Sequence, residues 1–287
     1  MFEGFDEKDI QLSGATLHVR VGGSGPPLLL LHGHPRTHAT WYAVAPLLAA
    51  NRTVVCPDLR GFGRSSQPAD HPSHLHSSKR AKARDCVELM AALGFDRFDL
   101  VGHDRGAYTA FRCALDHPAA VRRLAILDAV PICEALDRAG AKFALAWWHW
   151  FFFCTPDKPE RAINADPLAW YAPSREAMGA GNYDDMVAAI GNPAVVHGMI
   201  EDYRAGPVID YSDEVADRAA GRRIECPVLV LWALEDDLEY LYGDVLGVWR
   251  SWAPDLSGRG FPSGHHMAEE EPALLAEALD AFFAGRD

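Results

Sequence analysis

The stretch that decides the fold is Phe98-Asp99-Leu100-Val101-Gly102-His103-Asp104-Arg105-Gly106-Ala107-Tyr108. Its first half is apolar like a buried strand, and the residues that follow have helical spacing, so the pattern predicts a strand, a sharp turn and a helix. Asp104 occupies the tip of the turn, and Gly102 and Gly106 leave the room that such a strained turn requires. A carboxylate at this tip needs no base to become nucleophilic, and it can displace a leaving group from carbon. The stretch therefore predicts hydrolysis through a covalent aspartyl ester.

The segments on either side of this stretch alternate between strands and helices. Short apolar runs that predict buried strands lie at Leu28–Leu31, Thr53–Cys56, Leu124–Leu127 and Pro227–Leu231, and helical spacing occurs at Trp41–Ala50 and Ala83–Leu93. Such alternation implies right-handed crossovers and a mostly parallel sheet that is flanked by helices. The predicted fold class is α/β.

Residues 131–223 interrupt the alternation. This part has helical patterns and many aromatic residues, most densely at Trp147–Phe153. We expect it to form an inserted α-helical cap, with residues 1–130 and 224–287 making the core. Most of the aromatic side chains would pack inside the cap, and a cap of this kind would exclude water from a charge-separating reaction.

The composition limits both ligands and location. A net charge of −13 argues against nucleic acid and anionic membrane surfaces, whereas a small anionic substrate needs only one or two local arginines. The six cysteines lie far apart and form no C-x-x-C pair, so we expect reduced core residues and neither disulfides nor a metal site. The acidic Met1–Lys8 has no apolar leader, and no later segment is apolar enough to span a bilayer. We expect a cytoplasmic protein.

Two further groups would complete a catalytic triad. His265 follows the last expected strand and is the predicted general base. Two acids compete to orient it: Asp128 ends the strand after the elbow helix, and Asp236 follows the next strand. Geometry decides triads, and we favour Asp128. The backbone N–H groups of His34 and Arg105 would form the oxyanion hole, and the order nucleophile, acid, histidine is that of the α/β hydrolases.

Further motifs lie along the chain at His32–His38, Asp58–Gly63, Gly102–Gly106, Trp148–Trp150, Glu201–Gly206 and Ser263–His265. Together they resemble the haloacetate (fluoroacetate) dehalogenases of the α/β-hydrolase superfamily. The resemblance covers essentially the whole chain. The first two motifs are general in the superfamily, whereas the Asp-Arg-Gly elbow and the Trp-His-Trp patch are far more specific.

The resemblance implies roles for particular residues. Asp104 would be the nucleophile, His265 the base and Asp128 its acid, while Arg105 would grip a substrate carboxylate in bidentate fashion. It implies a halide site made of N–H and O–H donors from the cap: His149, Trp150 and Tyr203. It also suggests a homodimer, and no cofactor is implied.

Two positions depart from the family pattern. Tyr108 stands where the family has a second carboxylate-binding arginine, four residues past the nucleophile, and His34 stands where an aromatic residue usually follows His-Gly. Tyr108 lies about one helical turn from Asp104, so we keep it in the predicted carboxylate site. Arg36, on the same loop as His34, is a candidate to supply the missing positive charge.

The sequence thus predicts hydrolysis of the carbon–halogen bond of a short 2-halocarboxylate to a 2-hydroxy acid and halide. An epoxide hydrolase also uses an aspartate nucleophile, and its two proton-donating tyrosines would be Tyr203 with Tyr171 or Tyr211. A neutral-haloalkane dehalogenase is a related alternative. A catalytically silent binding protein is disfavoured because no triad member is missing.

Overall fold

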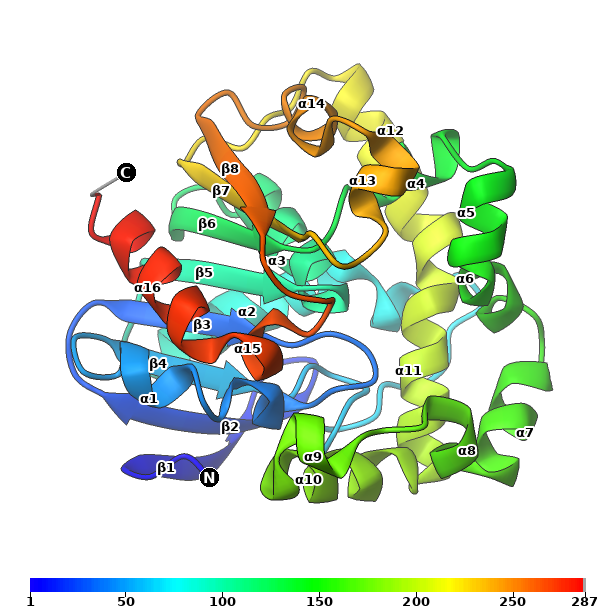
Figure 1. Ribbon diagram of the computed structural model, residues 1–287, viewed down its shortest axis with the longest axis horizontal. Helices are drawn as coiled ribbons and strands as arrows, with labels where there is room; N and C mark the ends of the chain where they lie inside the picture. The colour runs from blue at the N-terminus through cyan, green and yellow to red at the C-terminus, as the bar shows by residue number, and fades with distance from the viewer. Residues whose placement is uncertain (286–287) are drawn as a thin grey trace.

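The frame of the molecule is one eight-stranded sheet, seen in the computed structural model, which describes residues 1–285 (Figure 1). The strand order is β1-β2-β4-β3-β5-β6-β7-β8. The strands are β1 (Phe5–Gln11), β2 (Thr16–Gly23), β3 (Pro27–Leu31), β4 (Thr53–Pro57), β5 (Phe98–His103), β6 (Val121–Leu127), β7 (Val228–Ala233) and β8 (Leu256–Phe261). β2 is antiparallel to β1 and β4, and the remaining pairs are parallel. The prediction of a mostly parallel sheet is confirmed.

The edge strand β1 has no counterpart among the predicted strands. Its residues 6–9 are all charged and all exposed, so they show no apolar alternation. The strand forms through backbone pairing with β2, where Phe5 lies opposite Gly22. A side chain at Gly22 would collide with the Phe5 ring, at 2.5 Å. Charged residues on an exposed edge also oppose pairing with other chains.

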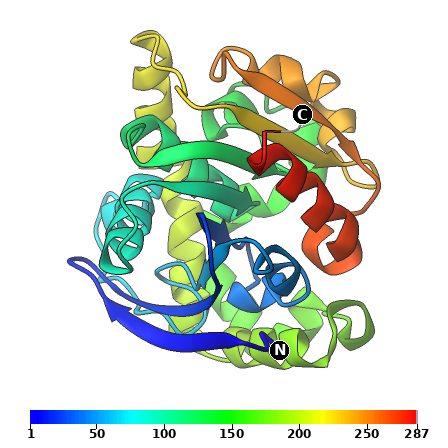
Figure 2. The same cartoon turned by 90° about the vertical axis from the view of Figure 1, so that its left-hand side faces the viewer.

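Each face of the sheet carries its own apolar core, covered by helices. α2 (Lys79–Ala92) and α3 (Arg105–Asp116) cover one face, and α1 (Ala45–Leu48) and α16 (Pro272–Phe283) cover the other (Figure 2). Alternate residues of β3 contribute to opposite cores, as the two-residue period of a strand requires. All six residues of β5 are buried because the strand lies in the middle of the sheet.

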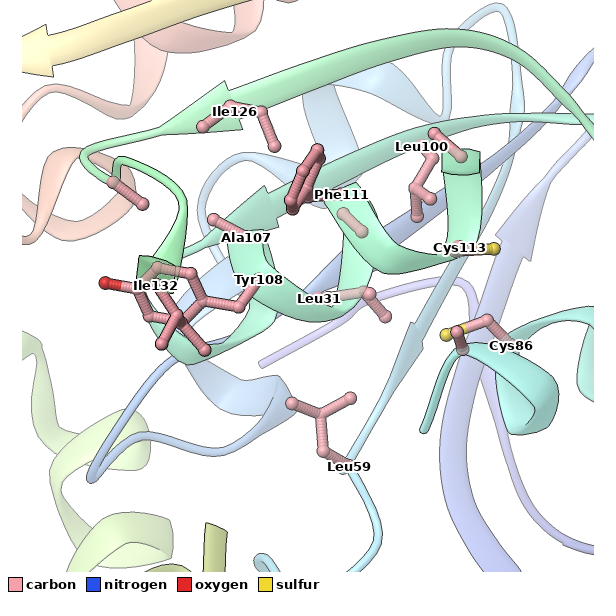
Figure 3. Close-up of a cluster of buried hydrophobic side chains, with 14 of the residues drawn as sticks. Leu31, Leu59, Cys86, Leu100, Ala107, Tyr108, Phe111, Cys113, Ile126 and Ile132 are labelled. Carbon is pink, nitrogen blue, oxygen red and sulfur yellow. The ribbon is translucent and has the colours of Figure 1, made fainter. Parts of the chain in front are cut away.

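Helix α3 is fixed firmly against this sheet. Figure 3 shows Ala107 and Phe111 of α3 beside Leu100 of β5 and Ile126 of β6. Eleven of its twelve residues are buried. The elbow that precedes α3 is therefore held on a rigid support.

Nine helices between β6 and β7 form a helical insertion beyond the carboxyl ends of the parallel strands, and α11 runs across it (Figure 1). They are α4 (Ile132–Asp137), α5 (Ala141–Ala146), α6 (Trp148–Phe153), α7 (Lys158–Ala165), α8 (Pro167–Tyr171), α9 (Arg175–Met178), α10 (Ala180–Ile190), α11 (Pro193–Ala205) and α12 (Tyr211–Ala219). A π-helical turn at Gly206–Asp210 joins the last two. Open α/β sheets keep their sites at the carboxyl ends of strands, so the insertion covers the region where a site is expected.

The remaining helical segments are short: η1 (His38–Trp41), η2 (Leu75–Ser77), α13 (Leu238–Tyr242), α14 (Val245–Trp249) and α15 (Met267–Glu270). The helix predicted over Trp41–Ala50 is divided into η1 and α1 instead. Pro46 stands in the first turn of α1, where a missing N–H is tolerated, so the chain starts a new helix there. No helix among residues 1–285 combines the length and the apolar character needed to span a membrane.

Candidate active site

The elbow has the strained geometry that its sequence predicts. Asp104 has φ of 49° and ψ of −118°, and it lies between β5 and α3. A Cβ at Gly102 would lie 2.4 Å from the Gly106 carbonyl oxygen, and one at Gly106 would lie 2.5 Å from that of His32. A Cβ at Gly33 would meet the Asp104 carboxylate itself, also at 2.4 Å. Glycine is therefore required on both sides of the nucleophile candidate and on the loop that faces it.

The histidine predicted as base lies across from this carboxylate. His265 Nε2 is 4.0 Å from Asp104 Oδ2, close enough for a water molecule to be shared between them. Its other nitrogen, Nδ1, is 2.6 Å from Asp128 Oδ2 and 3.1 Å from Asp236 Oδ2. The structure thus brings both candidate acids to the same nitrogen, with Asp128 nearer. Asp128 is also fixed by the Ala233 N–H, which donates to its Oδ1 at 2.9 Å.

The charges in this group perturb one another. Burial alone would lower the pKa of His265, but its hydrogen bonds to Asp128 and Asp236 raise that pKa well above its usual value. Burial would likewise raise the pKa of Asp104, but the positive charge of His265 holds it below its usual value. Asp104 is therefore an ionised carboxylate, the form that acts as a nucleophile.

The loop after β3 supplies a donor to Asp104. The backbone N–H of His34 donates to Asp104 Oδ1 at 2.6 Å. Arg105 is the first residue of α3, and the first N–H groups of a helix have no partner inside the helix. Of the two amides predicted for the oxyanion hole, that of His34 contacts the Asp104 carboxylate, and that of Arg105 follows Asp104 directly in the chain.

The side chain of Arg105 is buried and largely engaged. Its Nε donates to Asp202 Oδ2 at 2.5 Å and its Nη2 to the Asp202 carbonyl oxygen at 2.8 Å, whereas Nη1 is buried without a partner. The guanidinium carbon lies 4.1 Å from the centre of the Tyr203 ring and 5.1 Å from that of Tyr108. Bidentate binding of a substrate carboxylate would need two free nitrogens of Arg105, and only Nη1 lacks a partner. Asp202 comes from α11 and lies in the Glu201–Gly206 motif, in which only Tyr203 had a predicted role.

A cavity of about 250 Å³ opens over the nucleophile candidate. It is lined by Asp104, Tyr108, Asp128, Ala146, Trp147, His149, Trp150, Asp236, Asp237 and His265. Tyr108 is buried at the start of α3, and Figure 3 shows it next to Ile132. Its ring meets that of Trp150 edge to face, with centroids 5.9 Å apart. Tyr108 from the predicted carboxylate site and His149 and Trp150 from the predicted halide site thus line one cavity, whereas Arg105 is not part of its lining.

Of the three predicted halide residues, two line this cavity and one lies behind it. His149 and Trp150 belong to α6 and line the cavity. Tyr203 belongs to α11 and contacts the rings of these two residues. The Tyr203 ring centroid is 5.7 Å from that of His149 and 6.3 Å from that of Trp150. Burial lowers the pKa of His149 to about 4, so its imidazole is neutral and keeps one N–H to donate.

Two residues considered from the sequence lie elsewhere. Arg36 Nε and Nη2 both contact Glu269, at 2.7 and 3.0 Å, so Arg36 is not available as a second cation for a substrate. Tyr211 donates to Asp137 on the exterior of the helical insertion at 2.7 Å. Of the tyrosines considered for an epoxide, Tyr203 and Tyr171 both pack their rings against His34, whose backbone N–H donates to Asp104.

Two residues near the triad candidates were not predicted from the sequence. Asp237 lines it and accepts a hydrogen bond from Trp147 Nε1 at 2.7 Å, and burial raises its pKa to about 6. His103 lies under the base candidate, where its Nε2 is 2.7 Å from the His265 carbonyl oxygen. In the sequence, these two residues stand out only by position, because Asp237 follows the candidate acid Asp236 and His103 precedes the candidate nucleophile Asp104.

Two groups of side chains have the spacing of metal ligands in the described part of the chain. They are His103 with His265 and His266, and Asp128 with Asp236 and His265, each with ligand atoms within 4.8 Å. Both groups contain His265, whose Nδ1 is already held by the two carboxylates. The geometry favours proton transfer at His265 over metal ligation.

The fold and the elbow define the class of protein. The sequence profile of the alpha/beta hydrolase fold family matches residues 26–272, and the chain belongs to that family. The predicted fold class is confirmed.

Individual relatives point to two related reactions. A fluoroacetate dehalogenase from Burkholderia sp is 40% identical, across 99% of this chain and 95% of the relative. A soluble epoxide hydrolase from Corynebacterium sp is 31% identical, across 95% of each chain. The crystal structure of an alpha/beta hydrolase from Nostoc sp PCC 7120 matches with a TM-score of 0.95 at 42% identity and covers 99% of both chains. The chain is therefore a hydrolase similar to dehalogenases and to epoxide hydrolases.

Proposed function

We propose that this protein is a hydrolytic dehalogenase that converts short 2-halocarboxylates, such as haloacetates, into 2-hydroxy acids and halide. The observation that carries the proposal is the pairing of an elbow carboxylate, Asp104, with His265 at 4.0 Å, next to a cavity lined by His149 and Trp150. The similarity to a fluoroacetate dehalogenase over nearly the whole chain supports it. Residues 131–223 would act as the cap of this enzyme.

In the first step an oxygen of Asp104 attacks the halogen-bearing carbon. The carbon–oxygen bond forms as the carbon–halogen bond breaks, and the halide leaves with the bonding electron pair. N–H groups of His149 and Trp150 and the hydroxyl of Tyr203 would stabilise the charge that develops on the halogen. Arg105 Nη1, the buried nitrogen without a partner, would bind the substrate carboxylate.

In the second step His265 Nε2 takes a proton from water, and the resulting hydroxide attacks the ester carbonyl of Asp104. The amides of His34 and Arg105 would hold the tetrahedral oxyanion. Collapse of this intermediate releases the 2-hydroxy acid and restores the Asp104 carboxylate, and the proton on His265 returns to solvent. Asp128 would hold the His265 ring and balance its charge throughout.

Epoxide hydrolysis is the second candidate reaction. The Tyr171 hydroxyl is buried without a partner, and Tyr171 and Tyr203 both contact the ring of His34, whose backbone N–H donates to Asp104. Phenols placed in this way would protonate an epoxide oxygen. The ion pair of Arg105 with Asp202 would have no role in epoxide hydrolysis, and we therefore rank epoxide hydrolysis second.

A substrate panel tests the choice. We expect the purified protein to release halide from chloroacetate and fluoroacetate and to form no diol from styrene oxide. In His265→Asn the first step should continue while the second stops, so peptide mass spectrometry after chloroacetate treatment should show one carboxymethyl ester, on Asp104. His266→Asn is the matched control and should not accumulate the ester. Diol formation without halide release, or modification at another residue, would overturn the proposal.

A further inference from the structure

The cavity over the nucleophile candidate is acidic, although the proposed substrates are anions. Four of its ten lining residues are aspartates: Asp104, Asp128, Asp236 and Asp237. His265 is the one lining residue of the described chain with a positive charge, since burial lowers the pKa of His149 to about 4. An anion that enters this cavity therefore meets more negative than positive charge.

Asp237 differs from the other three aspartates in its partner. Those three each have a carboxylate oxygen within 4.0 Å of a nitrogen of His265. Asp237 instead accepts a hydrogen bond from the neutral indole N–H of Trp147, at 2.7 Å, and it forms no ion pair with any residue between 1 and 285. The charge of Asp237 is therefore the least compensated one in the cavity.

Asp237 also lies close to where a substrate would bind. Its partner Trp147 is stacked on Trp150, a candidate halide donor, with ring centroids 5.3 Å apart and an interplanar angle of 19°. The cavity volume of about 250 Å³ is below the range of roughly 300–1,000 Å³ that is usual for drug-sized ligands. A bound anion cannot be far from any wall of so small a cavity, and the wall at Asp237 would repel it.

The surroundings of Asp237 determine when it is charged. The groups that face it come from its own loop, the ends of β6 and β8, α13 and the insertion, and they are Asp236, Asp128, His265, Tyr242 and Trp147. Burial and the two neighbouring carboxylates raise the pKa of Asp237 to about 6, against the opposing effects of Trp147 and His265. Burial keeps the Tyr242 phenol neutral by raising its pKa. Asp237 is thus charged at neutral pH and neutral in mildly acidic solution.

We propose that Asp237 is a specificity-determining residue whose negative charge weakens binding of 2-halocarboxylates relative to neutral 2-halo compounds such as 2-haloamides. This inference rests on the proposed dehalogenase function and identifies what limits its substrate class. Asp237→Asn should therefore be a better haloacetate dehalogenase than the natural protein. The asparagine keeps a carbonyl oxygen that accepts from Trp147 Nε1, so the substitution removes the charge and retains the hydrogen bond.

The test compares kcat/KM for chloroacetate and chloroacetamide, followed by chloride release, with the release by Asp104→Ala subtracted. The two compounds share the attacked carbon and the leaving group, so the ratio of their kcat/KM values reports the effect of the substrate charge. At neutral pH this ratio should rise by about tenfold in Asp237→Asn, as expected for removal of a like charge within roughly 10 Å. The difference between the two proteins should disappear as pH falls below the pKa of Asp237, about 6.

Two further variants separate charge from structure. Glu235→Gln is the matched control, because it removes the same charge from the same loop outside the cavity lining, and it should leave the ratio unchanged. Trp147→Phe removes the hydrogen bond and keeps the carboxylate of Asp237, so the ratio should not rise. A rise in Trp147→Phe as large as that in Asp237→Asn would overturn the inference, because Asp237 would then act by holding Trp147.

Binding of compounds without halogen separates this inference from the reaction itself. By saturation-transfer NMR, Asp237→Asn should bind acetate about tenfold more tightly than the natural protein does and acetamide with unchanged affinity. If chloroacetate is hydrolysed but Asp237→Asn leaves the ratio unchanged, or improves both substrates equally, the inference is overturned and the proposed function stands. If neither compound releases halide, the proposed function fails, and the acetate measurement still decides whether Asp237 opposes anions.

Discussion

Arg105 and Asp202 form a buried ion pair that joins the elbow helix to helix α11 of the insertion, with Nε 2.5 Å from Oδ2. Lys79 and Lys82 contact the same carboxylate, and Lys79 is also 3.5 Å from Asp210. Three cations thus face two carboxylates in this buried cluster, and the charge of Asp104 also acts on Arg105.

The first prediction concerns the stability of this cluster. Asp202→Asn would leave three buried cations without their shared carboxylate, and removal of one member of a buried pair costs about 3–5 kcal/mol. We expect a loss of that size in the free energy of unfolding, measured with urea. Asp137→Asn is the matched control, because Asp137 pairs with Arg218 at the surface and such pairs contribute about 1 kcal/mol or less. Equal effects of the two substitutions would contradict the role given to Asp202.

The second prediction separates the two acids at His265 Nδ1. Asp128 is nearer, at 2.6 Å against 3.1 Å, and is buried, whereas Asp236 is partly exposed. We expect Asp128→Asn to lower turnover by up to about 10⁴-fold and Asp236→Asn by much less. Because both carboxylates reach the same nitrogen, the double variant should be slower than either single one. A larger effect of Asp236→Asn, with both variants folded by circular dichroism, would transfer the orienting role to Asp236.

The sequence predicted those parts of the site that local patterns specify. The tip position of Asp104 follows from its flanking glycines, and His265 follows from its place after the last strand. Contacts between distant segments left no such pattern. Arg105 and Asp202 are 97 residues apart, and Arg36 is paired with Glu269 across 233 residues. A charged side chain in a sequence gives its type but not its partner, so the engagement of both arginines required the structure.

The strands of the sheet also differ in how much of a pattern they leave in the sequence. The buried strands β3 and β5 were visible as apolar runs because both of their faces are covered. β1 was not visible because its side chains are exposed and its pairing depends on the backbone alone. The ends of short helices in the insertion depend on tertiary packing, which a single sequence does not display.

The third prediction uses the position where the chain departs from the dehalogenase pattern. Tyr108→Arg would place a second guanidinium in the cavity, near that of Arg105. Hydrogen bonds to charged groups contribute about 1.5–3 kcal/mol against about 1 for neutral ones, so the KM for chloroacetate should fall about tenfold. The added charge should also lower the free energy of unfolding, because it would lie close to the buried guanidinium of Arg105. Tyr108→Phe is the control and should change KM little. An unchanged KM in a folded Tyr108→Arg variant would show that the substrate is not bound as an anion here.

The last prediction concerns pH and follows from the charges around His265. Asp128, Asp236 and Asp104 all raise its pKa above the ordinary value, with burial acting in the opposite direction. The base must be neutral to take a proton from water, so hydrolysis of the ester should accelerate as pH rises. Formation of the ester needs ionised Asp104, whose pKa is lowered, and should be independent of pH above the acidic range. At mildly acidic pH the second step is therefore the slow one.

This difference between the two steps can be measured directly. Rapid quenching during chloroacetate turnover, followed by intact-protein mass spectrometry, should find a large fraction of esterified enzyme at mildly acidic pH and a small one at alkaline pH. The ester has no charge on Asp104, so the pKa of His265 should be lower in the intermediate than in the free enzyme. The free energy of unfolding should depend on pH for the same reason. Because the pKa of His265 is higher in the folded than in the unfolded chain, protonated His265 stabilises the fold fully below the unfolded pKa, and this stabilisation is lost as pH rises through the folded pKa. His265→Gln should remove this alkaline loss of stability. An ester fraction that stays constant with pH would show that His265 is not the base of the hydrolytic step.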